Sequence, residues 1–314
     1  MKKRVLVIGS SNMDFVCNTE RLPEAGETIT TKENYMLVPG GKGGNTAVAA
    51  ARLGADCVFC AKLGNDSYGR SLYDFYKSEG IDVRHVRISK EHPTGLASII
   101  VEGSGENRII VYPGANNHMT EEDVEASVIT YPGATIMQLE INYDRVVEAV
   151  RLCNERDIPV VLDAGPAKKE LDLSKLGKLE IFSPNETETE IFTGIKPCAY
   201  ESCINAAIAI RNMVDTKYVV LKLGAMGCFI YDGKYANFSE AFKVNAVDTT
   251  AAGDSFTAAL TLEYLRNGRN ILEAAKYANA VGAMVSSKHG AAPSIPDHDS
   301  VLAFIKAKED EKIG

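Results

Sequence analysis

Short apolar runs alternate with longer amphipathic segments through most of the sequence after residue 116. Apolar residues at helical spacing predict helices over 120–129, 143–155, 185–193 and 200–214. Continuous apolar runs predict strands over 134–139, 158–162, 179–182 and 217–222. Strands separated by helices pair in parallel, because each helix carries the chain back across the sheet. We therefore expect an α/β fold with a mainly parallel central sheet and helices on both faces.

Two stretches nearer the start of the chain break this alternation. The apolar run over 4–8 predicts a buried first strand, but 14–38 and 95–112 carry only short β-prone pieces, one of them at 27–31. Such pieces predict a small second sheet that acts as a lid. The sequence has no repeat of fixed period and no low-complexity linker, so we expect 1–314 to form a single domain.

Composition narrows the range of partners. A net charge of −8 and a pI near 5.3 argue against nucleic acid, so a phosphate-bearing ligand needs local dipoles and a metal. The apolar run near the start is too short for a signal peptide or a membrane span. The seven cysteines are scattered, although Cys57 and Cys60 have a CxxC-like spacing. We expect reduced thiols in a cytoplasmic protein rather than a zinc or redox site.

The stretch 247–256 carries the clearest chemical signal. Small residues at 251–253 allow a tight turn, and apolar residues at helical spacing then predict a helix from Ser255 to about Leu265. The free N–H groups and the dipole at the start of a helix favour a bound phosphate. Asp254 lies in the same turn, where a carboxylate is placed to accept the proton of a hydroxyl that attacks a phosphate.

A glycine-rich stretch, Pro39–Asn45, precedes an alanine-rich segment that predicts a helix over 46–53. Its spacing matches neither the P-loop nor the dinucleotide-binding fingerprint. Four glycines let the backbone approach a small ligand, and Lys42 and Asn45 can donate hydrogen bonds to it. A flexible glycine loop without a ligand is the alternative.

Polar residues follow several predicted strands, where open α/β sheets bind ligands. Asn12 and Asp14 after the first strand could hydrogen-bond to neighbouring hydroxyls of a ligand, or could simply form a turn. Glu140, after the strand at 134–139, could accept a further hydroxyl. Asn185 and Glu188 fit a helix capping box, and also fit the binding of the water ligands around Mg²⁺.

Two of these stretches resemble the signatures of the PfkB family of sugar kinases. Residues 248–254, Asp-Thr-Thr-Ala-Ala-Gly-Asp, resemble the C-terminal signature, and residues 40–45, Gly-Gly-Lys-Gly-Gly-Asn, resemble the N-terminal one. The family usually has Gly where this chain has Ala251, and the members that phosphorylate ribose share the change to Ala. Those members commonly have Gln where this chain has Thr46. The two signatures occur in the family's order, with Asn-Glu-Thr-Glu at 185–188 between them, and the resemblance extends from Asn12 to Ser294.

The resemblance implies roles for individual residues. It makes Asp254 the catalytic base, beside phosphate-binding N–H groups of Ala251, Ala252 and Gly253. It gives the sugar contacts to Asn12, Asp14, Gly41, Lys42, Asn45, Glu140 and Asp254. It gives the ATP and Mg²⁺ contacts to Asn185, Glu188, Lys222, Gly224, Gly227, Gly253 and Asn279. It gives a K⁺ site to Asp248, Thr250, Val285, Lys288, Gly290 and Ser294.

The expected activity is ATP-dependent phosphorylation of the 5-hydroxyl of D-ribose. Deoxyribose, another sugar or a nucleoside remains an alternative acceptor, and a sugar- or nucleotide-binding sensor remains an alternative to an enzyme. Ribose-phosphorylating members usually carry a hydroxyl residue where this chain has Lys222, which either approaches a nucleotide phosphate or faces solvent. The β-rich lid has edges that need cover, and the family resemblance also implies a homodimer formed through it.

Overall fold

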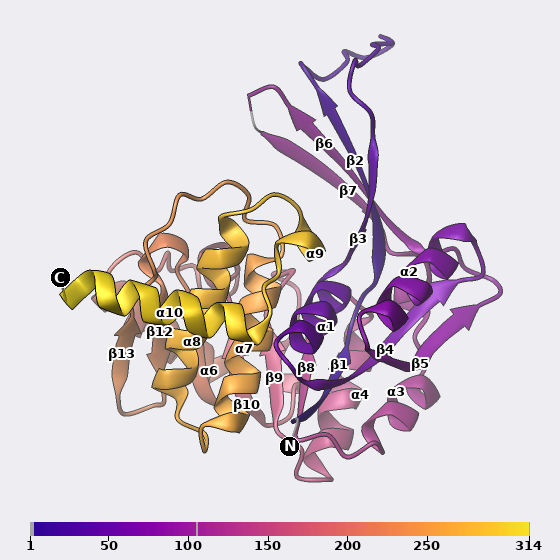
Figure 1. Cartoon of the computed structure of the whole chain (residues 1–314). Coiled ribbons are helices and arrows are strands. Elements are labelled where there is room, and N and C mark those ends of the chain that lie inside the picture. The colour runs from indigo at the N-terminus through magenta and orange to yellow at the C-terminus, as the bar shows by residue number, and fades with distance from the viewer. Residues whose placement is uncertain (1–2, 105, 314) are drawn as a thin grey trace.

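Two sheets of unequal size organise the protein (Figure 1). The computed structural model describes residues 3–104 and 106–313. Within them the larger sheet has the strand order β13-β12-β11-β10-β9-β8-β1-β4-β5. Its strands, in chain order, are β1 Arg4–Ile8, β4 Asp56–Gly64, β5 Asp82–Ser89, β8 Ala134–Met137, β9 Val160–Asp163, β10 Leu179–Ser183, β11 Thr216–Lys222, β12 Cys228–Tyr231 and β13 Ala236–Ser239.

The strand order places a ligand site near the middle of this sheet. From β5 to β11 all neighbouring strands pair in parallel, and only β12 and β13 are antiparallel. The chain starts at β1, moves to β4 and β5 on one side, and then returns to β8 on the other. Ligands bind outside the carboxyl ends of the strands where the order reverses in this way, here next to β1 and β8.

Helices cover both faces of the sheet, as the alternation predicted. Alternate residues of β1 point to opposite faces, so that Val5 and Val7 join one core cluster and Leu6 and Ile8 join the other. The first cluster packs against α1 Lys42–Arg52, α2 Ser67–Ser78, α7 Ala252–Arg266, α8 Ile271–Ser286, α9 Ala291–Ser294 and α10 His298–Ile313. The second packs against α3 Glu121–Val128, α4 Tyr143–Asn154, α5 Glu186–Thr193 and α6 Tyr200–Met213.

The smaller sheet is formed by the two stretches predicted to act as a lid, and it projects from one end of the body (Figure 1). Its order is β3-β2-β6-β7, with strands β2 Asn12–Thr19, β3 Met36–Gly40, β6 Gly95–Glu102 and β7 Asn107–Tyr112. The strand predicted at 27–31 was wrong. Those residues are irregular because no strand lies beside them, and a turn at Gly26 is closed by the ion pair of Arg21 with Glu27. The sequence between β6 and β7 includes Gly105, which lies outside the described residues.

Two helices begin earlier than their apolar spacing predicted. Helix α1 starts at Lys42 rather than residue 46, and α7 starts at Ala252 rather than Ser255. The glycine-rich stretch is therefore the end of β3 followed by the first turn of α1, and not a flexible loop. The N–H of Gly44 donates to the Ser10 carbonyl oxygen at 2.9 Å, which fixes this turn against the end of β1.

The cysteines form neither a metal cluster nor a disulfide. Cys57 and Cys60 are buried side chains of β4, and burial raises the pKa of the Cys60 thiol to about 12. No group of three or more metal-binding His, Cys, Asp or Glu side chains occurs in the described part of the chain. Among the described helices, none combines the length and apolar character that a membrane crossing needs.

A methyl group at position 43 should disrupt the contact between α1 and β1. A Cβ atom built on Gly43 would lie 2.6 Å from the Gly9 carbonyl carbon and 2.7 Å from the Ser10 nitrogen, and backbone cannot give way as a side chain can. We expect Gly43→Ala to lower the free energy of unfolding by about 1–3 kcal/mol, measured by urea denaturation.

Gly282→Ala in α8 is the matched control, because nothing lies within 4 Å of its added Cβ. Alanine is the better helix former, so this variant should gain about 0.5–1 kcal/mol. Equal stability changes in the two variants would contradict the proposed steric contact.

Candidate active site

Polar side chains converge where β1 and β8 end. Glu140, just beyond β8, accepts hydrogen bonds from the Ser10 hydroxyl and, at 2.9 Å, from the N–H of Lys42. Asp14 lies close enough to Glu140 and Asp254 for their charges to act on it. Burial first, and then these two carboxylates, raises the pKa of Asp14 to about 7. The predicted sugar residues therefore meet in one cluster, with carboxylates suited to accept hydroxyl hydrogens.

Asn12 is oriented by a residue that the sequence reasoning missed. The side-chain amide of Asn116 donates to Asn12 Oδ1 at 2.8 Å, and its Oδ1 accepts from the N–H of Ser11 at 2.9 Å. With its oxygen held in this way, Asn12 has its NH₂ group left to donate to a ligand. Asn116 lies in a short 3₁₀ helix, Gly114–His118, and its sequence context carried no recognisable signal.

Asp254 lies in the first turn of α7 and is almost fully buried. Its Oδ2 accepts from the Asn45 side-chain amide at 2.9 Å, and its Oδ1 lies 3.7 Å from Lys42 Nζ. Burial raises the pKa of the Asp254 carboxyl, while Lys42 and Asn45 oppose that rise. The two signature stretches, some two hundred residues apart in sequence, therefore meet at this carboxylate.

The turn before α7 is strained. Ala251 has φ 62°, a left-handed conformation that costs a non-glycine residue about 1–2 kcal/mol. The N–H of Ala252 donates to the Thr249 carbonyl oxygen at 3.1 Å, so it is engaged within the turn rather than free as predicted. A helix leaves its first N–H groups without partners inside the helix, and here those of Gly253 and Asp254 face no carbonyl oxygen of the described residues.

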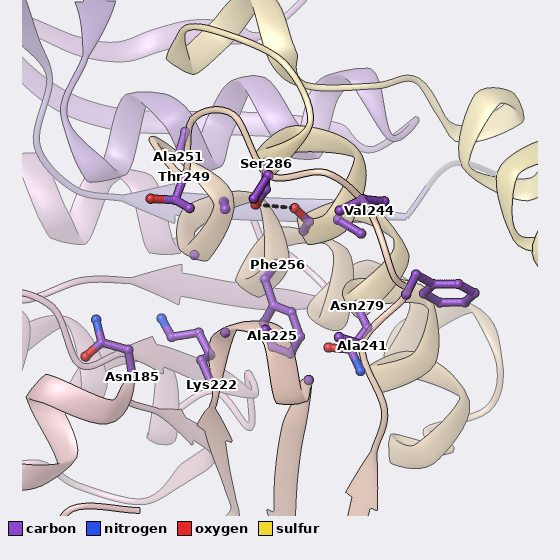
Figure 2. Close-up of a pocket in the computed structure, with 18 of the residues that line it drawn as sticks. Asn185, Lys222, Ala225, Ala241, Val244, Thr249, Ala251, Phe256, Asn279 and Ser286 are labelled. Atoms are coloured by element: carbon purple, nitrogen blue, oxygen red, sulfur yellow. Dashed lines mark hydrogen bonds between the residues drawn. The ribbon is translucent and has the colours of Figure 1, made fainter. Parts of the chain in front are cut away.

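A cavity of about 800 Å³ opens on the other side of the Asp254 turn (Figure 2). This volume falls in the range of small-molecule sites, roughly 300–1,000 Å³. Asp254, Lys42, Asn185, Glu188 and Asn279 all line it. Its remaining wall includes Phe242, Val244 and Ala246, which sequence reasoning missed because they lie in an irregular segment after β13.

Asn185 and Glu188 form the predicted capping box at the start of α5. The N–H of Asn185 donates to Glu188 Oε2 and the N–H of Glu188 donates to Asn185 Oδ1, both at 2.8 Å. Burial raises the pKa of the Glu188 carboxyl. Each side chain keeps a second polar atom and lines the cavity, so capping and ligand binding are compatible.

Lys222 ends β11 inside the site and does not face solvent. Its Nζ lies 2.5 Å from Oδ2 of Asp163, the last residue of β9. Asp163 was not predicted, although the apolar run Val160-Val-Leu before it places a polar residue at the carboxyl end of a buried strand. The signal was the same as for Asn12 and Glu140.

The other predicted nucleotide residues lie farther along the cavity. Gly224 and Gly227 line it, and Gly227 has φ 93° with no room for a Cβ, which would lie 2.1 Å from the Ser239 carbonyl oxygen. Asn279, on α8, uses its amide group to donate to that same oxygen at 2.9 Å. This bond joins α8 to the end of β13 at the cavity wall.

The segments predicted to hold K⁺ also come together. Asp248 Oδ1 accepts from the N–H of Thr250, and its Oδ2 accepts from the N–H of Gly290, both at 2.9 Å. The carbonyl oxygen of Val285 accepts from the N–H of Lys288 at 3.2 Å, and the Ser294 hydroxyl donates to the Ala291 carbonyl oxygen. Asp248 thus links the turn before α7 to the loop after α8.

A buried carboxylate at a helix start, between a hydroxyl-binding cluster and a nucleotide-sized cavity, defines a phosphotransferase that acts on a small polyhydroxy molecule. Residues 2–298 match the pfkB family of carbohydrate kinases, and the chain belongs to that family.

Similar proteins agree with the family. The chain is 36% identical to a ribokinase of Haemophilus influenzae, over 98% of this chain and 99% of that protein. It is 31% identical to a deoxyribokinase of Salmonella typhi, over 97% and 99% of the two. The solved structure of Arabidopsis thaliana ribokinase complexed with ribose and ATP covers 98% of this chain and 99% of its own, with 32% identity and a TM-score of 0.87.

The raised pKa of Asp14 should appear as pH-dependent stability. In the unfolded chain the pKa of Asp14 is near its ordinary value of 3.8, whereas in the folded protein the Asp14 carboxyl keeps its proton up to about pH 7. The burial cost of the charge is therefore absent below pH 3.8, grows between pH 3.8 and 7, and is complete above 7. We expect Asp14→Asn to raise Tm relative to the unmodified protein at pH 8, and less so at pH 5.

Asp297→Asn provides the control. Hydrogen bonds from Ser300 lower the pKa of Asp297, so its carboxyl is ionised in both states throughout this range. Its effect on Tm should be the same at pH 5 and pH 8. A constant effect of Asp14→Asn over the same range would contradict the burial of a titrating carboxyl at position 14.

Proposed function

We propose that this protein is an ATP-dependent kinase that transfers the terminal phosphoryl group of ATP to the 5-hydroxyl of D-ribose. One observation carries the proposal: the Asp254 carboxylate is held by Asn45 and Lys42 between the hydroxyl-binding cluster and the large cavity. The ribokinases with which the chain shares about a third of its residues over nearly its full length support ribose as the acceptor.

The sugar would bind on the side of β1 and β8. Asn12, Asp14 and Glu140 supply a donor and two carboxylates for ring hydroxyls, with Gly41, Lys42 and Asn45 of the α1 start beside them. A site that fixes several hydroxyls orients the remaining one toward the phosphate. In this arrangement the reacting hydroxyl meets Asp254.

Asp254 would take the proton of the attacking hydroxyl. A base must be ionised before it can act, and burial works against that. Lys42 offsets the burial because its Nζ lies 3.7 Å from the carboxylate, and Asp254 in turn raises the pKa of Lys42. Lys42 thereby keeps Asp254 available as a base in a site from which water is excluded.

The start of α7 would hold the transferred phosphoryl group. The stretch Ala251–Gly253 turns sharply there, and its residues line the cavity beside Asp254. N–H groups fixed in place before the reaction stabilise charge that builds up on phosphate oxygens. Because the N–H of Ala252 is engaged with Thr249, we assign this role to Gly253 first.

The residues present fit Mg²⁺ and K⁺. The atoms of Asn185 and Glu188 that the capping box leaves free suit the water ligands of Mg²⁺, which when bound to ATP neutralises phosphate charge. Asp248 has both oxygens engaged with N–H groups, but backbone carbonyls of the adjoining loop suit a monovalent cation. We assign K⁺ to Asp248, Thr250, Val285, Lys288, Gly290 and Ser294.

Deoxyribose is the nearest alternative acceptor, supported by similarity to the Salmonella deoxyribokinase. Another sugar or a nucleoside would use the same Asp254 chemistry. A sensor that binds without reacting is disfavoured because Asp254 has a positioned cation and an adjoining helix start, which binding alone does not require.

The test is ATP turnover with Mg²⁺ against a panel of pentoses, hexoses and nucleosides, with K⁺ or Na⁺ as the monovalent cation. We expect a strong preference for ribose and stimulation by K⁺. Asp254→Asn should lower kcat at least ~10²-fold, the low end for general base catalysis, while the fold and ribose binding persist. Asp297→Asn, at an exposed position where the carboxylate accepts hydrogen bonds from Ser300, should keep the original kcat.

Each other outcome has a meaning. Preference for deoxyribose or a nucleoside would replace the acceptor and keep the mechanism. Unchanged kcat in a folded Asp254→Asn variant would contradict the role of Asp254, and binding without turnover on any acceptor would favour the sensor.

We further propose that 1–314 acts as a single kinase domain that works in the cytoplasm and pairs through its lid. Its seven cysteines are all free thiols, which suits a reducing compartment. The lid edge strands β3 and β7 expose large apolar side chains, chiefly Met36, Leu37, Ile109, Ile110, Val111 and Tyr112. Such a surface favours association, since soluble monomers rarely expose an apolar patch of this kind.

A two-fold dimer through the lid should appear in sedimentation at micromolar concentration. Ile109 and Ile110 are 53% and 55% exposed and point to opposite faces of β7. We expect the double substitution of both by Asp to give a monomer with an intact body. A monomeric unmodified protein would contradict pairing through the lid.

A further inference from the structure

The side chain of Lys222 crosses the carboxyl end of the sheet inside the cavity. The backbone N–H of Lys222 donates to the Pro184 carbonyl oxygen at 2.8 Å, and this bond fixes the backbone of Lys222 beside Asn185. From there the side chain reaches past the end of β10 to Asp163 on β9. Figure 2 shows Lys222 and Asn185 side by side at the cavity wall.

Asp163 is held from three directions. Its Oδ2 accepts from Lys222 Nζ at 2.5 Å and from the Thr257 hydroxyl of α7 at 2.6 Å. Its Oδ1 accepts from the N–H of Gly165 at 3.2 Å. The carboxylate is 2% exposed and the Lys222 side chain 11% exposed, so both charges are removed from water.

The Lys222 ammonium lies against the start of α7. A Cβ built on Gly253 would be 3.6 Å from Lys222 Nζ. The Lys222 ammonium therefore adjoins the N–H groups assigned to the transferred phosphoryl group. It lies on the cavity side, where the remainder of a nucleoside triphosphate would bind.

The negative charge of the buried Asp163 carboxylate needs a cation beside it. Burial alone would raise the pKa of Asp163, but Lys222 and Lys42 outweigh it and hold that pKa below its ordinary value. Asp163 is thus a carboxylate beside a phosphate site, where a lone negative charge would repel the ligand. A buried ion pair adds little net stability, whereas a cation fixed beside phosphates stabilises their charge strongly.

We propose that Asp163 and Thr257 are positioning residues that hold the Lys222 ammonium against the start of α7, so that Lys222 binds the terminal phosphate oxygens of the nucleotide. This rests on the proposed use of ATP. Asp163 then serves a second purpose, because it neutralises the Lys222 charge when no phosphate is bound.

The experiment compares Lys222→Thr, Asp163→Asn, the double variant and Thr257→Val. Binding of ADP and of a non-hydrolysable ATP analogue is measured by calorimetry, alongside Tm and the KM values for ATP and ribose. Lys62→Thr is the control, because Lys62 lies 2.9 Å from Asp123 in a pair of similar burial, 14% and 13% exposed, formed between β4 and α3.

Lys222→Thr should weaken binding of the ATP analogue at least ~10-fold, more than it weakens ADP, with KM for ribose unchanged. It leaves Asp163 charged and unpaired beside the phosphates. The double variant removes that charge and should bind the analogue better than Lys222→Thr alone. Thr257→Val, which removes one hydrogen bond to Asp163, should give a smaller loss in the same direction and still fold if Asp163→Asn does not.

Lys62→Thr should lower Tm and leave nucleotide binding unchanged. If Lys222→Thr lowers Tm but leaves nucleotide binding unchanged, the pair of Lys222 and Asp163 is structural and the inference is wrong. The inference is also wrong if binding of ADP and binding of the ATP analogue weaken equally. Nucleotide binding is measured without sugar, so a wrong assignment of ribose leaves this result intact. Failure of the unmodified protein to bind either nucleotide would overturn the ATP proposal and this inference with it.

Discussion

The site depends on the balance between buried carboxylates and two lysines. Asp254 and Glu188 line one cavity, Asp163 pairs with Lys222 at its wall, and burial favours the protonated form of each carboxylate. Lys42 and Lys222 oppose this, Lys42 at Asp254 and Lys222 at Asp163. Because charges act strongly where water is excluded, the two ammonium groups determine which carboxylates are ionised and whether a phosphate can approach them.

Helix α7 carries both halves of this balance. Its first turn holds Asp254 and the N–H groups proposed to bind phosphate, and one turn later Thr257 binds Asp163. The strained Ala251 before it sets the direction in which the helix starts. Strain of this kind persists only where the surroundings fix the backbone, and the bonds of Asp248 to Thr250 and Gly290 do so here.

Sequence reasoning recovered the elements with strong local signals and missed those set by distant contacts. The alternation after residue 116 predicted the parallel strands and the helices on both faces, and the signature stretches predicted Asp254 with Asn45. The start of α1 was missed because its glycines have poor helix propensity, and only the contact with the end of β1 makes them helical. Asn116 was missed because its role comes from three hydrogen bonds to Ser11 and Asn12, about a hundred residues earlier in the chain.

The proposed lid and the proposed sugar site share one strand, so their positions are coupled. β2 begins at Asn12, directly after β1, and Asn12 and Asp14 point to the same face of the lid sheet. Gly40 and Gly95 flank Asn12 in the neighbouring strands, and a Cβ on either would lie within 2.2 Å of the Asp14 or Asn12 side chain. A ligand that binds these two side chains more tightly in one lid position than in another must shift the lid toward the position that it binds more tightly. The difference between its affinities for the two lid positions sets the size of that shift.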